Sequence, residues 1–99
     1  MILEHAFLQV RPGEKRAFEA ALAEAKPLIA ASPGFLGIEV RPSVATPDQY
    51  LLLVRWESVA DHRDGFRQST RYEQWRALLH HFYDSMPDVT YFEDPLCLI

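Results

Sequence analysis

His62 is the residue of this chain whose type best suits proton transfer near neutral pH. An unperturbed imidazole titrates near ~6.5, so a histidine can accept a proton and return it under physiological conditions. The local pattern places His62 on a short helix that follows an apolar strand. Alternatively, this histidine only caps the helix or makes a local hydrogen bond, and the sequence leaves both interpretations open.

Hydrogen-bond donors and aromatic side chains lie close to His62 in the sequence. Arg67 and Tyr72 can donate to a hydroxyl group or to a developing oxyanion. Aromatic residues of the same region can form the walls of a binding site: Trp56, Phe66, Trp75 and Tyr83. Aromatic residues at a strand end or at helical spacing usually belong to the core, and that remains the alternative for Trp56 and Trp75.

The other histidines are weaker candidates. His5 falls among apolar neighbours in the first predicted strand, where a histidine is usually a hydrogen-bonded core residue. His80 and His81 are adjacent, so on a helix they point about 100° apart and do not easily share one metal ion. Near a helix C-terminus a histidine is favoured by the helix dipole, which makes capping the better interpretation. We expect no metal site.

The composition indicates one small domain without a nucleic-acid partner. The chain has 99 residues, 48% of them hydrophobic, and a formal net charge of −4 at pH 7. An acidic balance argues against binding to nucleic acid. Four arginines share one stretch with acidic residues, which is typical of a salt-bridged solvent face: Arg63, Arg67, Arg71 and Arg76. The chain has neither a glycine-rich phosphate loop nor a G-x-S-x-G motif, which argues against nucleotide cofactors and hydrolase chemistry.

The sequence carries no signature of a membrane span or of a secretion signal. The longest strongly apolar run covers 50–54, far short of the ~20 residues that a membrane helix needs. The N-terminal residues lack a basic region, and Glu4 interrupts their apolar run. We therefore expect a cytoplasmic location. Cys97 is the only cysteine and lies two residues from the end, so a structural role is favoured over catalysis.

Alternating and helical apolar patterns predict the elements that position these residues. Strands are expected at 2–10, 35–41, 50–56 and 89–92, and helices at 14–31, 59–66 and 70–82. Ser58 and Asp61 resemble a capping box, Ser69 is expected to cap the last helix, and Pro27 predicts a kink or irregularity in the first. The order β-α-β-β-α-β predicts a ferredoxin-like α+β fold, a four-stranded antiparallel sheet with both helices on one face.

Both faces of the predicted sheet are apolar, and the helices can cover only one. The first strand carries Ile2, Ala6, Leu8 and Val10 on one side and Leu3 and Phe7 on the other. An uncovered apolar face favours pairing with a second copy of the chain, sheet against sheet. The alternative is that the C-terminal tail, residues 95–99, folds over that face, although five residues can cover only part of it.

The chain resembles the antibiotic biosynthesis monooxygenase (ABM) domain family, whose members are dimeric α+β barrels. The resemblance rests on Pro33-Gly34-Phe35-Leu36 before the second strand and on Tyr50-Leu-Leu-Leu-Val-Arg-Trp-Glu-Ser58 from the third strand into a helix. His62 and Ser69-Thr-Arg-Tyr72 follow in the same order. The similarity covers about residues 2–93 and implies a homodimer.

The resemblance implies several possible activities, because the fold hosts different chemistries. One branch of the family oxidises polyphenolic or anthrone-type substrates with dioxygen, without metal or flavin. A heme-degrading branch relies on an asparagine of the first strand, together with a tryptophan and a histidine of the later helix. This chain contains no asparagine. Heme degradation is therefore not expected.

The favoured hypothesis is a cofactor-independent monooxygenase that acts on an aromatic, polyphenolic or quinol-like small molecule. In this hypothesis His62 is the leading candidate for the base, and Arg67 and Tyr72 are the candidate partners of a substrate oxyanion or hydroxyl group. The aromatic residues named above form the walls, and His5 contacts substrate because the cleft of this fold borders the first strand. Two alternatives are a non-catalytic ligand-binding or stress-related protein and an isomerase or decarboxylase.

Overall fold

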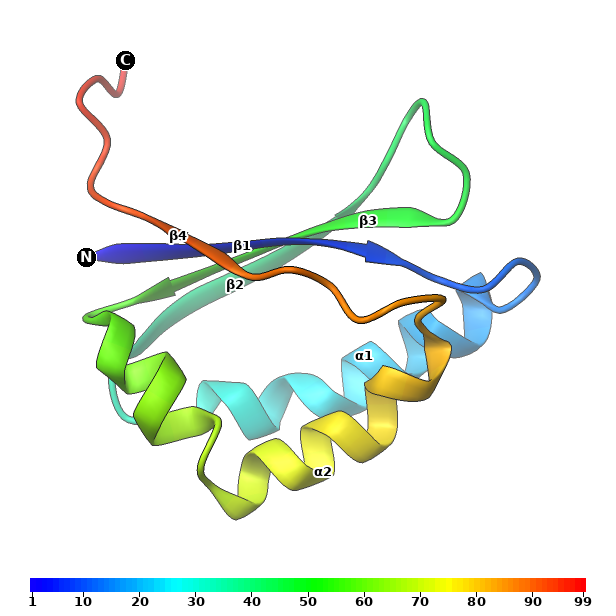
Figure 1. Ribbon diagram of the computed structural model, residues 1–99, viewed down its shortest axis with the longest axis horizontal. Helices are drawn as coiled ribbons and strands as arrows, with labels where there is room; N and C mark the ends of the chain where they lie inside the picture. The colour runs from blue at the N-terminus through cyan, green and yellow to red at the C-terminus, as the bar shows by residue number, and fades with distance from the viewer.

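A four-stranded antiparallel sheet with its helices on one face makes up the structure, a computed structural model that describes residues 1–99 (Figure 1). The strands are β1 (Ile2–Gln9), β2 (Phe35–Pro42), β3 (Gln49–Trp56) and β4 (Thr90–Phe92), in the spatial order β2-β3-β1-β4. The helices are α1 (Lys15–Ala30) and α2 (Thr70–Leu79), with a π-helix η1 (Asp61–Phe66) before α2 and a 3-10 turn η2 (His80–Phe82) after it. The predicted ferredoxin-like α+β fold is confirmed. None of the helices has the length and apolar character that crossing a membrane requires.

The short helix expected before α2 is a π-helix, and it carries His62. The backbone N–H of Arg67 bonds to the carbonyl of His62 at 3.0 Å, the wider spacing that defines this helix type. The first residue of η1, Asp61, packs directly against Gly34, which lies just before β2. Gly34 has a φ of +82°, and a Cβ at this position would collide with the Asp61 side chain. Ser58 caps this segment as predicted, accepting a hydrogen bond from the N–H of Asp61 at 3.2 Å.

The two longer helices largely follow their sequence patterns. Ser69 caps α2 as predicted, because its hydroxyl accepts the N–H of Tyr72 at 3.2 Å. The regular α-helix ends at Leu79, and the predicted last turn is the tighter η2. Helix α1 runs unbroken through Pro27, although proline lacks the N–H that would bond to the preceding turn.

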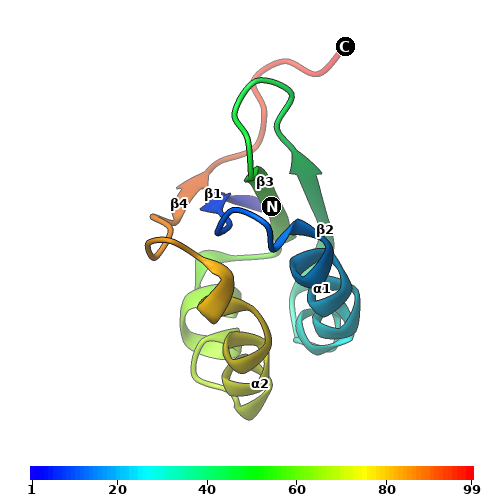
Figure 2. The ribbon, with the colours of Figure 1, turned by 90° about the vertical axis from the view of Figure 1, so that its right-hand side faces the viewer.

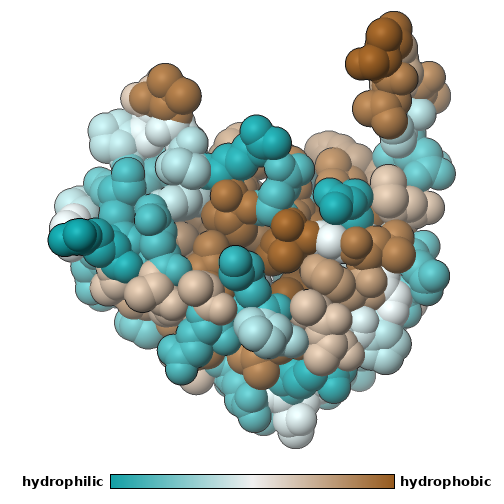
Figure 3. All heavy atoms as spheres, turned by 180° about the vertical axis from the view of Figure 1, so that it is seen from behind, coloured by the Kyte–Doolittle hydropathy of each residue, from teal (hydrophilic) through white to brown (hydrophobic).

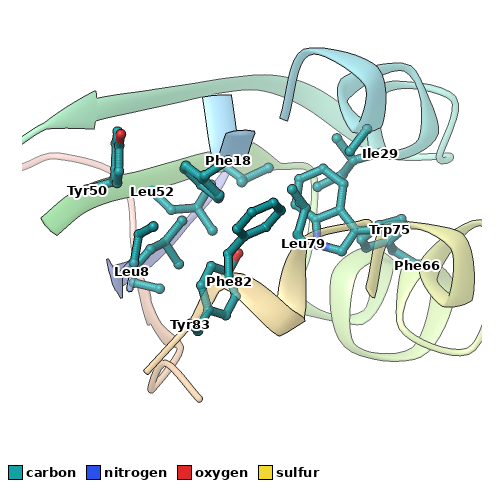
Figure 4. Packing of buried hydrophobic residues seen from close by; sticks show 14 of the residues in the cluster. Leu8, Phe18, Ile29, Tyr50, Leu52, Phe66, Trp75, Leu79, Phe82 and Tyr83 are labelled. Carbon is teal, nitrogen blue, oxygen red and sulfur yellow. The ribbon is translucent and has the colours of Figure 1, made fainter. Parts of the chain in front are cut away.

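The core lies between the helices and the inner face of the sheet. Alternate residues of β1 and β3 point into it, as the period of two in a strand requires. Figure 4 shows Phe18 and Ile29 of α1 meeting Trp75 and Leu79 of α2 beneath these strands. Phe66 of η1 packs at the same end of the helical layer, so the segment that carries His62 is anchored in the core.

The outer face of the sheet is uncovered and carries several exposed apolar side chains beside the charged residues of β2. Phe7, Leu36 and Phe92 are 54%, 47% and 45% exposed. The β2–β3 loop and the C-terminal tail both project beyond this face, on either side of it (Figures 1 and 2). Hydrophobic residues gather at the tip of the tail and on the surface between the two projections (Figure 3). The tail does not cover the sheet, since Leu98 and Ile99 are almost fully exposed.

Candidate functional site

A small cavity of about 60 Å³ lies between the inner face of the sheet and the helices. Most of the side chains that line it are hydrophobic, and they come from β1, β3, α1, α2, η1, η2 and the segment before β4. Met86, Pro87 and Val89 of that segment close one side. The cavity therefore joins regions that are distant in the sequence.

Six of the residues that the sequence indicates for the site line this one cavity: His62, Phe66, Arg67, Tyr72, Trp75 and Tyr83. Helix α2 supplies Tyr72 and Trp75, and η1 with its C-cap supplies the first three. The rings of Tyr72 and Trp75 pack edge-on against Phe66, with centroids 5.4 and 5.8 Å away. The structure thus brings the predicted donors and aromatic walls together.

Two predicted site residues do not line the cavity. Trp56 is completely buried in the layer behind it, as its core interpretation proposed. His5 points to the opposite, outer face of the sheet, where its ring packs edge-on against Phe7 and Phe92 with centroids 5.0 and 5.6 Å away. Because neighbouring residues of a strand point to opposite faces, β1 can bring Glu4 to the cavity but not His5.

Glu4 is the cavity residue that the sequence reasoning missed. Its carboxylate lies on the inner face of β1, is only 4% exposed, and accepts a hydrogen bond from the indole N–H of Trp56 at 2.9 Å. The sequence did contain a signal for Glu4, because the strand alternation that places Ile2 and Ala6 on the inner face also places Glu4 there. A carboxylate between core positions of a strand is uncommon unless it is paired or functional.

His62 is buried between two other side chains of the site. Its Nδ1 lies 2.6 Å from the hydroxyl oxygen of Tyr91, and its Nε2 lies 3.4 Å from Oε1 of Glu4. Its ring packs against Trp56, with centroids 5.4 Å apart. Both nitrogens of the imidazole therefore face polar partners within the protein.

Tyr91 is a second residue that the sequence reasoning did not single out. In the pairing of β1 with β4, Tyr91 lies directly opposite Glu4, so both side chains point to the inner face. The strand containing Tyr91 was predicted, but its register against β1 is a long-range property that no local pattern reveals. That register is what brings the Tyr91 hydroxyl to His62.

The buried positions of Glu4 and His62 shift their proton affinities in opposite directions. Burial raises the pKa of Glu4 to about 6, although the hydrogen bond from Trp56 and the positive charge of Arg67 oppose this rise. Burial, with a smaller contribution from Arg67, lowers the pKa of His62 to about 4. At pH 7 the imidazole is therefore neutral and the carboxylate mostly ionised.

The charge of Glu4 selects the tautomer of His62. An ionised carboxylate favours a proton on the facing Nε2, which leaves Nδ1 to accept the hydrogen bond from the Tyr91 hydroxyl. Burial and the charge of Glu4 raise the pKa of Tyr91, so this hydroxyl keeps its proton. The protons thus point from Tyr91 to His62 and from His62 toward Glu4.

Other polar groups border the same cavity. His80 and Tyr83 line it from η2 and its C-cap, and their rings pack with centroids 5.6 Å apart. Burial lowers the pKa of His80 and raises that of Tyr83, which keeps both neutral near pH 7. No three histidine, cysteine or acidic side chains converge in a way that could hold a metal ion.

Comparisons with known proteins agree with this fold and place the chain in a family. The sequence profile described as Antibiotic biosynthesis monooxygenase (ABM) matches residues 1–78. The uncharacterized protein YczJ of Bacillus subtilis (strain 168) is 39% identical over 94 residues, which cover 95% of this chain and 99% of YczJ.

Solved structures with a similar fold also include proteins described as antibiotic biosynthesis monooxygenases. A Bordetella bronchiseptica protein, provisionally described as an antibiotic biosynthesis monooxygenase, has 36% identity and a TM-score of 0.91 over 96% of this chain and 97% of its own. SnoaB from Streptomyces nogalater, a cofactor-independent oxygenase, has 16% identity and a TM-score of 0.83 over 98% of this chain and 95% of its own, a likeness of fold. The profile match and the similarity to YczJ show that this chain belongs to the antibiotic biosynthesis monooxygenase family.

Proposed function

We propose that this chain is a cofactor-independent monooxygenase that oxidises an aromatic, polyphenolic or quinol-like small molecule in the cavity beneath the sheet. The observation that carries the proposal is the buried pair of Glu4 and His62 at the wall of a mostly aromatic and aliphatic cavity. Such a pair can take a proton from an acidic phenol or benzylic C–H group. The aromatic walls exclude water and hold the ring.

The reaction needs no group beyond the substrate and dioxygen. A substrate with an activated methylene group loses a proton to the protein, and the carbanion transfers electrons to dioxygen to form a C–O bond. The proton returns to the peroxide, giving a hydroperoxide on the former methylene carbon. Loss of the second C–H proton and of hydroxide then gives a ketone and water. One oxygen atom enters the product, the other leaves as water, and the substrate supplies all four electrons.

Arg67 and Tyr72 are the proposed stabilisers of the substrate anion. Both line the cavity, and both carry donors that can face an oxygen on which negative charge develops. The positive charge of Arg67 also contributes to the low pKa of His62, so its field reaches the buried pair. Fixed donors aimed at developing charge are typically the largest single contribution to such catalysis.

A protein of similar structure supports the proposal that this fold can carry out this chemistry. SnoaB is a cofactor-independent oxygenase, so the same arrangement of strands and helices hosts oxygenation without a cofactor in that protein.

The substrate of this chain must enter by displacing part of the cavity wall. A cavity of about 60 Å³ holds only a few water molecules, whereas a site for an aromatic ligand is typically ~300 Å³ or more. The segment with the exposed Met86 lines one side of the cavity, and we propose that this side opens for the substrate.

The working unit of the proposed enzyme is a homodimer with a cytoplasmic location. The exposed Phe7, Leu36 and Phe92 form an apolar sheet face that a second copy would cover. The β2–β3 loop and the C-terminal tail project on either side of that face and would contact the partner subunit from both sides.

The experiment that tests the proposal is oxygen uptake with a panel of anthrones, hydroquinones and polyphenols, each repeated without oxygen. We expect consumption of one dioxygen per substrate, with no conversion in the anaerobic sample. Saturable binding without oxygen uptake would show a ligand-binding protein instead. Conversion without oxygen would show an isomerase or decarboxylase.

A further inference from the structure

Both imidazole nitrogens of His62 face polar groups of the protein, and Nδ1 is hydrogen-bonded. Nδ1 is 2.6 Å from the Tyr91 hydroxyl, and Nε2 faces Oε1 of Glu4 at 3.4 Å. A general base needs a free lone pair directed at the substrate. In the tautomer that the Glu4 charge selects, the lone pair of His62 lies on Nδ1 and is taken by Tyr91, which does not line the cavity.

Glu4 has the free acceptor that His62 lacks. Its Oε1 accepts the indole N–H of Trp56 and faces His62, while its Oε2 accepts no hydrogen bond from the protein. The carboxylate lines the cavity directly. A substrate in the cavity can therefore reach one oxygen of Glu4 without breaking a contact that holds the other.

We propose that Glu4 is the group that takes the substrate proton, through Oε2, and that His62 and Tyr91 are positioning residues for its carboxylate. The assignment rests on the proposed function, because it concerns the proton-removal step of that reaction. The O–H or C–H bond of the substrate breaks, its electron pair stays on the substrate, and the proton forms an O–H bond on Glu4. The same proton later returns to the peroxide oxygen.

The surroundings of Glu4 fit this role. Trp56 of β3 donates to the carboxylate, His62 of η1 faces it at 3.4 Å, and Tyr91 of β4 contacts the other nitrogen of that imidazole. Arg67 is the charged group that acts on it, and three further titratable residues line the same cavity: Tyr72, His80 and Tyr83. The pKa of about 6 leaves Glu4 ionised at pH 7 but basic enough to accept a proton, which suits a general base.

The test is hydrogen–deuterium exchange at the methylene of anthrone in heavy water without oxygen, followed by proton NMR. This assay measures proton removal alone, so it does not depend on oxygenation. We expect the wild type to accelerate exchange and Glu4→Gln to lose the acceleration by on the order of 100-fold or more. Glutamine keeps an oxygen for the Trp56 N–H, and Glu24→Gln on the exposed side of α1 is the matched control.

His62→Phe separates positioning from catalysis. Phenylalanine keeps a ring beside Trp56 but removes both nitrogens, so Glu4 loses the Nε2–H that favours its ionised form. We expect exchange at pH 7 to fall about tenfold, with the midpoint of its pH profile moved upward, and partial recovery in His62→Gln. His81→Gln, at an exposed histidine, is the matched control.

The outcomes separate this assignment from the proposed function. Exchange that depends on Glu4 but is accompanied by no oxygen uptake under air would contradict the monooxygenase and support the role of Glu4. Oxygen uptake with full exchange in Glu4→Gln, and none in His62→Phe, would support the monooxygenase and make His62 the base. Absence of accelerated exchange in the wild type would overturn the assignment.

Discussion

The indole nitrogen of Trp56 donates a buried hydrogen bond of 2.9 Å to the carboxylate of Glu4, across the paired strands β3 and β1. Trp56 does not line the cavity, and it contributes to the site only through this hydrogen bond. It is a fully buried core residue, and it also holds the one carboxylate that lines the cavity. The hydrogen bond between Trp56 and Glu4 therefore links the hydrophobic core to the cavity.

Trp56→Phe should destabilise the fold through the loss of this hydrogen bond. A buried hydrogen bond to a charged group contributes about 1.5–3 kcal/mol, and its loss should also raise the pKa of Glu4 further. Urea denaturation at pH 7 measures the free energy of unfolding. Trp75→Phe is the control, since Trp75 is also buried but its ring nitrogen bonds to no protein group. Equal losses in the two variants would contradict the account.

Glu4→Gln should stabilise the protein at pH 7. The folded-state pKa of Glu4 is raised from 4.5 to about 6, so its contribution to stability is full below pH 4.5 and lost as the pH rises through 6. A shift of this size corresponds to about 2 kcal/mol, which the neutral amide avoids. Denaturation at pH 7 and at pH 4 should show the advantage of the variant only at pH 7. An unchanged difference between the two pH values would show that Glu4 is not perturbed.

His62 should make the fold sensitive to acid. Its folded-state pKa is lowered from 6.5 to about 4, so the unfolded chain takes up a proton first as the pH falls. The free energy of unfolding should therefore drop between pH 6.5 and 4 by more in the wild type than in His62→Phe. Thermal unfolding across this range, compared between the two proteins, measures the difference. Parallel curves would contradict a buried neutral imidazole.

Arg67→Gln should slow turnover without unfolding the protein. A donor aimed at a developing oxyanion is typically worth about 10²–10³ in kcat, and Arg67 lines the cavity. Arg63→Gln is the matched control, because Arg63 lies in η1 just before Arg67, is 61% exposed and pairs with Asp64. Oxygen uptake at saturating substrate separates the two variants. Similar rates in both would remove Arg67 from the proposed mechanism.

Phe7→Glu should prevent pairing of the sheets. Phe7 is 54% exposed in the middle of the apolar outer face, and a buried charge there has no partner. Light scattering after size-exclusion chromatography should give a dimer for the wild type and a monomer for the variant. Ala20→Glu, on the exposed side of α1, should remain dimeric. A monomeric wild type would contradict the proposed assembly.

The sequence predicted the elements and most of the cavity because both depend on local patterns. Apolar periodicity located the strands and helices, and Phe66, Tyr72 and Trp75 were indicated because they lie close to His62 along the chain. The contacts of Glu4 were missed because they arise from strand register: β1 pairs with β4 so that Glu4 faces Tyr91. His5 does not line the cavity, because it shares the outer face with Phe7 while Glu4, one residue earlier, points inward.

The most direct test of the central claim is the fate of labelled dioxygen. Anthrone incubated with the protein under oxygen-18 gas, after removal of metal ions by a chelator, should give a ketone that carries one labelled oxygen atom by mass spectrometry. The labelled product should be lost in Glu4→Gln and in Arg67→Gln and retained in Arg63→Gln. An unlabelled product, or bound anthrone that remains unchanged in air, would contradict cofactor-independent oxygenation in this cavity.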